Sequence, residues 1–177
     1  MWGMIATWRM ALEGIQKVTP NLEAGGTAGD AIEGAIKEVE DFPYFKSVGY
    51  GGLPNEEMEV ELDAAYLDGS TFDFGAVCAL KQFANPISVA RALSAYKVNN
   101  VLVGEGAAAF AKAHHFEEKD MLTDRAKIHF HNRLKDIERE QLTPYAGHDT
   151  VGMVGLDASG DMVAGTSTSG LFMKKPG

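Results

Sequence analysis

Two short β-rich runs after residue 150 constrain the fold of this chain more than any other part of the sequence. They span 151–157 and 162–170, and the residues between them, Ala158-Ser159-Gly160-Asp161, are typical of a turn. We therefore predict a β-hairpin whose first strand begins at Thr150. The return strand carries four hydroxyl residues at 166–169. Antiparallel pairing would bring this hydroxyl run and Thr150 to the same end of a sheet.

Thr150 is a candidate nucleophile only under one chemical condition. A threonine hydroxyl becomes reactive when the residue's own α-amine is free to act as base. That amine has a pKa near 8, close to working pH. Because Thr150 is internal, a free amine requires that the Asp149–Thr150 bond be cut. Taken alone, an Asp near a turn and a Thr in a strand favour a structural role over a catalytic one.

The rest of the sequence predicts strands and helices in packed layers, of the α/β or α+β class. Thr27 and Asn85 are typical helix N-caps, and Pro86 suits the first position of a helix. Val98 is expected to face the core together with the apolar residues of that helix. A helical turn is expected at 12–18, ending before Pro20. The expected strands are 3–8, 60–67, 74–83 and 101–103 (the last one buried), and the expected helices are 27–41, 86 onward, 107–114 and 124–141.

Composition and charge exclude several classes of function. The chain has 177 residues and a net charge of −9, so it lacks the basic patch of a nucleic-acid-binding protein. No basic cluster favours an anionic membrane surface, and no apolar run is long enough for a membrane span. The N-terminus does not read as a signal peptide, so a cytoplasmic setting is the simplest expectation.

Metal and cysteine chemistry find little support in the sequence. The spacings of His114-His115 and of His129 and His131 do not place two imidazoles on one helix face, so no metal is assigned. No cofactor is expected either. Cys78 is the only cysteine, which excludes a disulfide within the chain, and its apolar neighbours are typical of a small core residue. Trp8, at the end of the first expected strand, could form an aromatic wall at the end of a sheet.

A larger sequence pattern favours a catalytic role for the Asp149-Thr150 pair over a structural one. Blocks along the whole chain resemble glycosylasparaginases, which are N-terminal-nucleophile hydrolases related to plant-type asparaginases and isoaspartyl peptidases. The triplet His148-Asp149-Thr150 favours the glycosylasparaginase branch, since plant-type asparaginases usually have Gly before the nucleophile. The matching blocks are Ala6-Thr7-Trp8, Ser47-Val48-Gly49-Tyr50-Gly51-Gly52, Glu61-Leu62-Asp63-Ala64 with Asp68-Gly69, Gly75-Ala76-Val77, Asn85-Pro86-Ile87-Ser88-Val89-Ala90-Arg91, Val103-Gly104-Glu105-Gly106-Ala107, His148-Asp149-Thr150-Val151-Gly152-Met153 and Thr166-Ser167-Thr168-Ser169-Gly170.

This resemblance implies an α+β fold, a four-layer α-β-β-α sandwich. It also implies self-cleavage into an α-subunit, residues 1–149, and a β-subunit that starts at Thr150. Thr150 would be the nucleophile, Thr168 would lie beside it, and Trp8 would line the substrate pocket. Asp149, with His148 before it, would assist the cleavage by activating the Thr150 hydroxyl.

The implied activity is hydrolysis of the side-chain amide of asparagine-linked substrates, which releases aspartate. Free asparagine or β-aspartyl peptides are alternative substrates, and an inactive homologue that acts as a binding protein is a second alternative. The α and β pieces are expected to associate, as a homodimer of αβ units. Family members continue with a Gly-Arg-Val-Gly-Asp-like motif beyond the hydroxyl strand, so residues 150–177 are expected to be only the start of the β-subunit.

Overall fold

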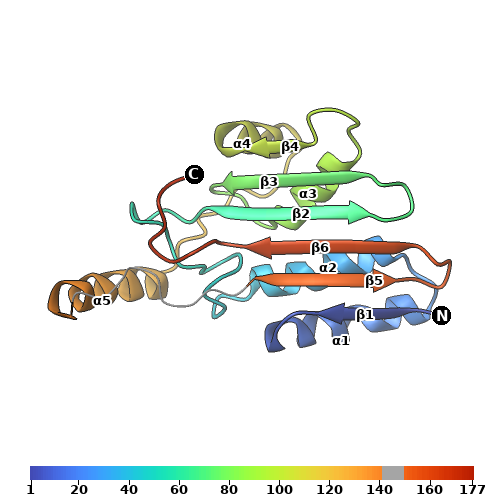
Figure 1. Ribbon diagram of the computed structural model, residues 1–177, viewed down its shortest axis with the longest axis horizontal. Coiled ribbons are helices and arrows are strands. Elements are labelled where there is room, and N and C mark those ends of the chain that lie inside the picture. Colours follow the sequence, from blue (N-terminus) through green and yellow to red (C-terminus); the bar gives the residue numbers. More distant parts are fainter. Residues whose placement is uncertain (141–149) are drawn as a thin grey trace.

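The computed structural model describes residues 1–140 and 150–177 as a mixed α+β unit built on one six-stranded sheet (Figure 1). The strand order across the sheet is β1-β5-β6-β2-β3-β4. All neighbours are antiparallel except β3 and β4, which are parallel. The strands are β1 (Gly3–Ala6), β2 (Leu62–Asp68), β3 (Phe74–Leu80), β4 (Val101–Val103), β5 (Val151–Leu156) and β6 (Met162–Thr168).

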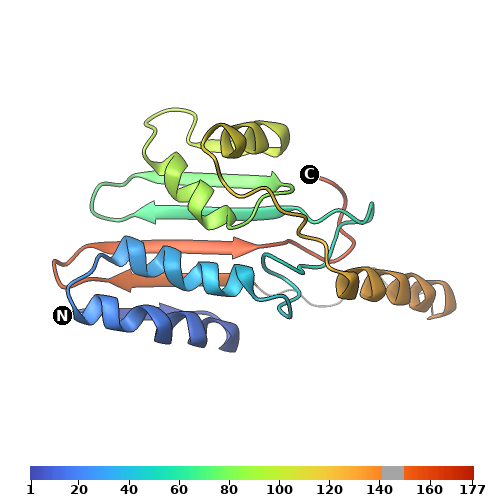
Figure 2. The ribbon, with the colours of Figure 1, turned by 180° about the vertical axis from the view of Figure 1, so that it is seen from behind.

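Most of the helices lie on one side of this sheet, but the helix over residues 124–140 projects beyond the ends of the strands (Figure 1). Figure 2 shows α1, α2 and α3 in front of the strands when the molecule is seen from behind. Ile32, Ile36 and Ile87 are completely buried between these helices and the sheet. Gly75 lets α3 approach closely, because a side-chain carbon there would lie 2.1 Å from the Ala90 carbonyl oxygen. The helices are α1 (Leu12–Glu23), α2 (Ala28–Asp41), α3 (Pro86–Ser94), α4 (Gly104–Ala113) and α5 (Asp124–Glu140), with a short 3-10 helix, η1 (Arg9–Ala11), before α1.

The predicted hairpin is confirmed. Strands β5 and β6 pair antiparallel with Val151 opposite Ser167, so the beginning of β5 and the end of β6 meet. Thr150 lies immediately before β5. The N-cap of α2 is also confirmed, since the Thr27 hydroxyl accepts a hydrogen bond from the Asp30 amide at 3.1 Å.

Three predictions about the bounds or the burial of local segments were wrong. Helix α1 continues through Pro20 to Glu23, where Leu22 is completely buried. Val98 lies outside α3 and is 74% exposed, so it does not face the core. Strand β4 exists, but it is an edge strand whose Val101 and Val103 are exposed rather than buried.

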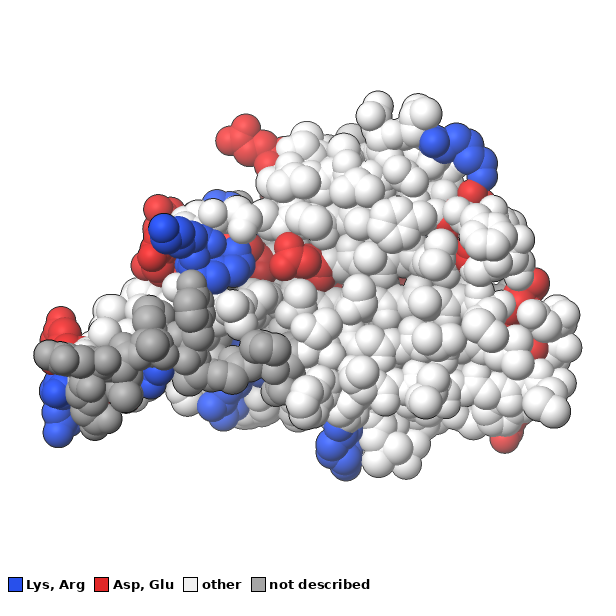
Figure 3. Space-filling view, in the orientation of Figure 1, with Lys and Arg blue, Asp and Glu red and all other residues white. Residues whose placement is uncertain are grey.

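Among the described residues, no helix covers the other face of the sheet, and its exposed side chains are largely apolar. Alternate residues of each strand point to this side, and Ile5, Met162 and Val103 are 71%, 51% and 58% exposed. Figure 3 shows that this face carries few charged side chains over most of the strands. Contiguous exposed apolar surface of this kind marks a face that binds another layer or another molecule.

Asp157 fixes the hairpin to the helical layer. Its side chain is buried, and one carboxylate oxygen, Oδ2, accepts a hydrogen bond from the Ala28 amide at the start of α2, at 3.0 Å. The other, Oδ1, accepts from the amides of Ser159 and Asp161 at 3.0 and 3.1 Å. These bonds hold the pKa of the Asp157 carboxyl below its usual value, and the bond from Ala28 has the largest effect.

We predict that Asp157→Ala destabilises the full-length gene product by about 1–3 kcal/mol, because the buried Ala28 amide loses its acceptor. The exposed Ser159→Ala change in the same turn should stay within about 0.5 kcal/mol. A carboxyl with a lowered pKa stabilises the fold above its unfolded value near 3.9, and this contribution is lost as the pH falls through the lower folded value. Urea unfolding should therefore show a difference in unfolding free energy between the unaltered protein and Asp157→Ala that is smaller at pH 3 than at pH 7. Equal effects of the two substitutions would contradict this role of Asp157.

We also predict that the 177-residue chain alone self-associates or folds poorly, because its sheet has open edges at β1 and β4 and one uncovered face. Val154→Lys, on the uncovered face, should reduce the association seen by size exclusion. Val98→Lys is the matched control, since Val98 is more exposed but lies in a loop. A single monomer peak with a cooperative melt for the unaltered chain would contradict this prediction.

Candidate active site

The start of β5 is held in place by Thr7, which follows β1. The Thr7 hydroxyl donates a hydrogen bond to the Thr150 carbonyl oxygen at 2.8 Å and accepts one from the Gly152 amide at 2.9 Å. The Thr7 amide also donates to the Gly152 carbonyl at 2.9 Å. Three hydrogen bonds from one residue therefore fix the backbone on both sides of Val151. Thr150 itself is exposed.

Thr168 lies at the end of the neighbouring strand β6. Continuing the register of Val151 and Ser167 by one residue places Thr150 opposite Thr168. Residues directly opposite on adjacent strands have Cα atoms about 4.5–5.5 Å apart. The prediction that Thr150 and the hydroxyl run share one end of the sheet is therefore confirmed.

The Thr168 hydroxyl makes two hydrogen bonds. It donates to the Ser47 carbonyl oxygen at 3.2 Å and accepts from the Gly170 amide at 3.1 Å. The same Ser47 carbonyl accepts from the Ser169 amide at 2.7 Å. The loop that contains Ser47 is thereby tied to the end of β6.

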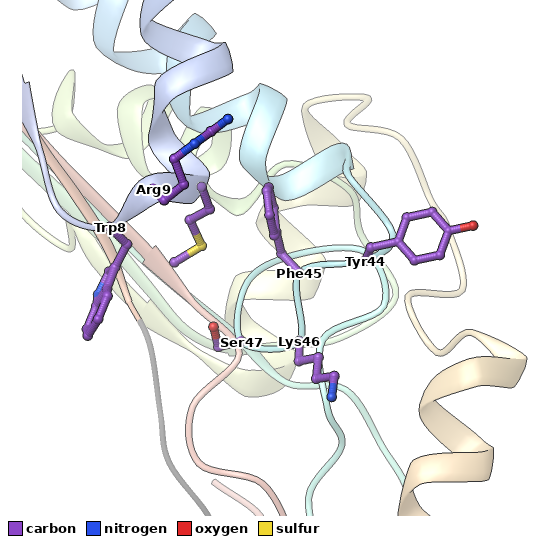
Figure 4. A pocket seen from close by; sticks show the side chains of 7 residues that line it. Trp8, Arg9, Tyr44, Phe45, Lys46 and Ser47 are labelled. Atoms are coloured by element: carbon purple, nitrogen blue, oxygen red, sulfur yellow. The ribbon is translucent and has the colours of Figure 1, made fainter.

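A pocket of about 320 Å³ lies close to Thr7 and to the loop that Thr168 holds. Trp8, next to Thr7, forms one side, and Ser47, next to Thr168, forms another (Figure 4). Trp8 is 60% exposed and has a φ of 64°, which is uncommon for a residue with a side chain. The pocket is completed by Arg9, Met10, Tyr44, Phe45 and Lys46.

The charged side chains that line the pocket are both cationic, although the chain as a whole is acidic. Arg9 forms an ion pair with Glu13 at 2.7 Å and points toward α1. Lys46 is exposed. Because Glu13 neutralises Arg9, Lys46 is the side chain of this lining that can attract a negatively charged ligand.

The predicted site residues are only partly described. Thr150 and Thr168 lie at one end of the sheet, and Trp8, which follows Thr7, lines the pocket. Asp149 and His148 lie outside the described residues. Thr7 and Ser47 were missed as contributors by pattern reasoning. The signal for Thr7 was its place at the end of a predicted strand, but its contact with Thr150 spans 143 positions and depends on the pairing of β1 with β5.

Other candidates for chemistry have structural roles. The His114 ring stacks on Phe110 with centroids 4.0 Å apart and hydrogen-bonds to the Tyr96 hydroxyl. Burial raises the pKa of the Cys78 thiol, which disfavours the reactive thiolate. Residues 1–140 and 150–177 contain no group of three or more His, Cys, Asp or Glu side chains arranged to hold a metal ion. None of the helices in these segments is both long and apolar enough to cross a membrane.

Comparison with known proteins shows the family to which this chain belongs. A family model described as asparaginase matches residues 6–177. The chain is 36% identical over 174 residues to the N(4)-(β-N-acetylglucosaminyl)-L-asparaginase of Elizabethkingia miricola, covering 98% of this chain and 51% of that protein. It is 35% identical over 176 residues to the isoaspartyl peptidase/L-asparaginase of Xenopus laevis, covering 97% of this chain and 56% of that protein.

A third relative extends the range of organisms. The plant-type L-asparaginase of Thermococcus kodakarensis is 40% identical over 162 residues, covering 84% of this chain and 52% of that protein. The chain spans about half the length of the curated relatives it matches. The match over nearly the whole chain, together with the arrangement of Thr150 beside Thr168, leads to one conclusion: this chain belongs to the asparaginase family of amidohydrolases.

Proposed function

We propose that the protein is an N-terminal-nucleophile amidohydrolase that cuts itself between Asp149 and Thr150 and then hydrolyses asparagine-linked substrates. The observation that carries this proposal is the placement of Thr150. It lies exposed at the start of β5, opposite Thr168, with its carbonyl held by Thr7. A nucleophile in a fixed backbone beside a pocket is the arrangement that covalent catalysis needs.

Self-cleavage begins when the Thr150 hydroxyl oxygen attacks the Asp149 carbonyl carbon. The C–N bond breaks, an ester forms on Oγ, and the nitrogen takes up the proton to become an amine. Asp149 assists by accepting the hydroxyl proton. Water then hydrolyses the ester, which leaves Asp149 with a carboxylate and Thr150 with a free amine and a free hydroxyl.

Substrate hydrolysis uses the new amine as the base. The amine takes the hydroxyl proton, Oγ attacks the side-chain amide carbonyl of the substrate, and the departing amine receives the proton. Water then releases aspartate from the ester. In this proposal Thr168, opposite Thr150 when the strand register is continued, hydrogen-bonds to the Thr150 hydroxyl. The Trp8 ring and Lys46, which line the pocket, would contact the rest of the substrate.

The substrate is proposed to be glycosylated asparagine, in line with the Elizabethkingia relative's name. Free asparagine or a β-aspartyl peptide is the alternative, which the Xenopus relative's name favours. Aspartate release from these three compounds, compared as kcat/KM on the full-length product, distinguishes them. Binding without release of aspartate would favour the inactive homologue instead.

We further propose the four-layer α-β-β-α sandwich for the whole protein, with a second sheet on the uncovered face. The exposed apolar side chains of that face support this, as does the half-length match to the relatives. Thr150 would then lie between the two sheets. In this arrangement residues 1–149 form the α-subunit and Thr150 begins the β-subunit, and two αβ units pair as a homodimer.

Self-cleavage gives the first test. We predict that the full-length product separates into two bands on a denaturing gel and that the smaller fragment begins Thr-Val-Gly-Met. Thr150→Ala should leave one band, because no hydroxyl remains for the acyl shift. Thr150→Cys should still cleave, since a thiol can make the same shift. A stable single band for the unaltered protein would contradict the proposal.

Thr7 gives a second test. We predict that Thr7→Val slows self-cleavage at least about tenfold, because the Thr150 carbonyl and the Gly152 amide lose their hydroxyl partner, and a loss of about 1.4 kcal/mol of positioning changes a rate tenfold. Thr7→Ser, which keeps the hydroxyl, should cleave nearly as fast as the unaltered protein. Equal rates for the valine and serine variants would show that this hydrogen bond does not position Thr150.

A further inference from the structure

Glu40 is a completely buried carboxyl group beneath the candidate site, and the proposed reaction does not use it. It lies in the last turn of α2, which ends at Asp41. An acidic residue near the end of a helix normally points into water. Glu40 instead meets three parts of the fold that converge on the site. Its carboxyl faces the start of α3 and strand β6, and its backbone contacts the loop 47–52.

Two donors from α3 reach the carboxyl. The Ile87 amide donates to Oε1 at 3.1 Å, and the Asn85 side-chain amide approaches Oε2 at 3.3 Å. Asn85 was expected to cap α3 with its side chain. It occupies the N-cap position but makes no side-chain capping bond, because its amide turns toward Glu40 and Asp41.

The backbone of Glu40 anchors the glycine loop. The Tyr50 amide donates to the Glu40 carbonyl at 2.6 Å. Gly49, with a φ of 62°, lies directly against the same residue, where an added side-chain carbon would be 2.4 Å from the Glu40 Cα. The loop thus begins at Ser47, which holds Thr168, and packs on Glu40 three residues later.

Strand β6 supplies the third neighbour. Ser167, directly before Thr168, points to the helical side of the sheet and lies beside the Glu40 carboxyl. Its hydroxyl oxygen is fully buried and forms no hydrogen bond with the described residues. Its nearness to Glu40 is one of the smaller effects that lower the pKa of that carboxyl. A buried hydroxyl without a partner is costly unless a donor or acceptor next to it completes the bond.

The charge state of Glu40 follows from its surroundings. In the described segments it forms no ion pair, and the charged side chain that acts on it most is Asp41, which is also negative. The other groups facing it are the Asn85 amide and Ile87 N–H of α3, Ser167 of β6 and the Tyr50 N–H of the loop. Burying an unpaired carboxylate costs far more than burying the neutral acid. Burial raises the pKa of Glu40 to about 8, against smaller lowering effects of the neighbouring donors.

We propose that Glu40 is a positioning residue: as a neutral carboxylic acid it donates its O–H to Ser167, and so ties β6 and the Ser47 loop together around Thr168. The proposal rests on the proposed function, since Thr168 is the residue that it positions. No bond to substrate is involved. When the proton leaves, an unpaired charge remains between α2 and β6, and the end of β6 loosens.

The sign of the pH effect follows from linkage. The unfolded carboxyl titrates near 4.3, well below the folded value. The folded state therefore binds a proton that the unfolded state releases between these values. Glu40 therefore lowers the free energy of unfolding as the pH rises from about 4.3 to about 8. Above that range it adds no further dependence of stability on pH.

Glu40→Gln in the full-length product mimics the neutral acid and tests the charge state. The Tm of this variant minus that of the unaltered protein should climb between pH 5 and pH 8 and then level off. Asp41→Asn, which removes the neighbouring exposed carboxylate, should keep the original slope. An infrared difference spectrum at pH 7 between the unaltered protein and Glu40→Gln should contain a carboxylic acid carbonyl band. Parallel Tm curves, or a carboxylate band alone, would overturn the proposal.

Hydrogen exchange tests the positioning itself without any need for activity. The Gly170 amide, bound to the Thr168 hydroxyl, should lose protection above pH 8 in the unaltered protein after correction for intrinsic exchange, but not in Glu40→Gln. In the active enzyme kcat should fall over the same range in the unaltered protein alone, with KM unchanged. Protection and kcat that are equal in both proteins across this range would show that Glu40 is only structural. An inactive protein that still shows the protection difference would contradict the proposed function and not the role of Glu40.

Discussion

The hydrogen bonds between the residues after β1 and the start of β5 join two parts of the chain that lie far apart in sequence. Through them Thr7 fixes the backbone around Thr150, and through the pairing of β5 with β6 the same strand meets Thr168. Hydrogen bonds in a sheet ladder fix register, and a slip by one residue would turn every side chain to the opposite face. The position of Thr150, the shape of the pocket beside Trp8 and the contact of Thr168 with Ser47 all depend on this register.

The two faces of the sheet differ in role: one packs against the helices and forms the core, and the other carries residues of the candidate site. The helical face buries the isoleucines of α2 and α3 and also holds Asp157 and Glu40, two acids with opposite environments. Asp157 accepts three backbone N–H bonds, which favour its charged form, whereas Glu40 is isolated from cations in the described residues and favours the neutral form. The uncovered face carries Thr168 and the exposed apolar residues of the strands. A second layer on that face would enclose the reacting groups and exclude water from them.

Local signals predicted the hairpin, helix α2 and the meeting of Thr150 with the hydroxyl run, because turn residues and caps act over a few positions. The same local signals failed where residues far apart in the sequence determine the structure. Pro20 is tolerated inside α1, β4 is an exposed edge, and Asn85 bonds to acids of α2 rather than to its own helix. Thr7 and Glu40 could not be recognised from sequence alone, since the role of each depends on a neighbour more than 40 positions away. His148 and Asp149 lie outside the described residues, so their assignment remains a prediction.

The central claim is that the Thr150 hydroxyl forms the covalent bond to substrate. The most direct measurement is rapid acid quenching of the matured full-length enzyme during turnover of an asparagine-linked substrate, followed by mass spectrometry of its peptides. The account predicts a single aspartyl group in ester linkage on the fragment that begins at Thr150, mapped to that residue and absent when the substrate is omitted. Two results would contradict the account while aspartate is steadily released. One is an aspartyl ester on a different residue, and the other is a Thr150 amine that is still in peptide linkage.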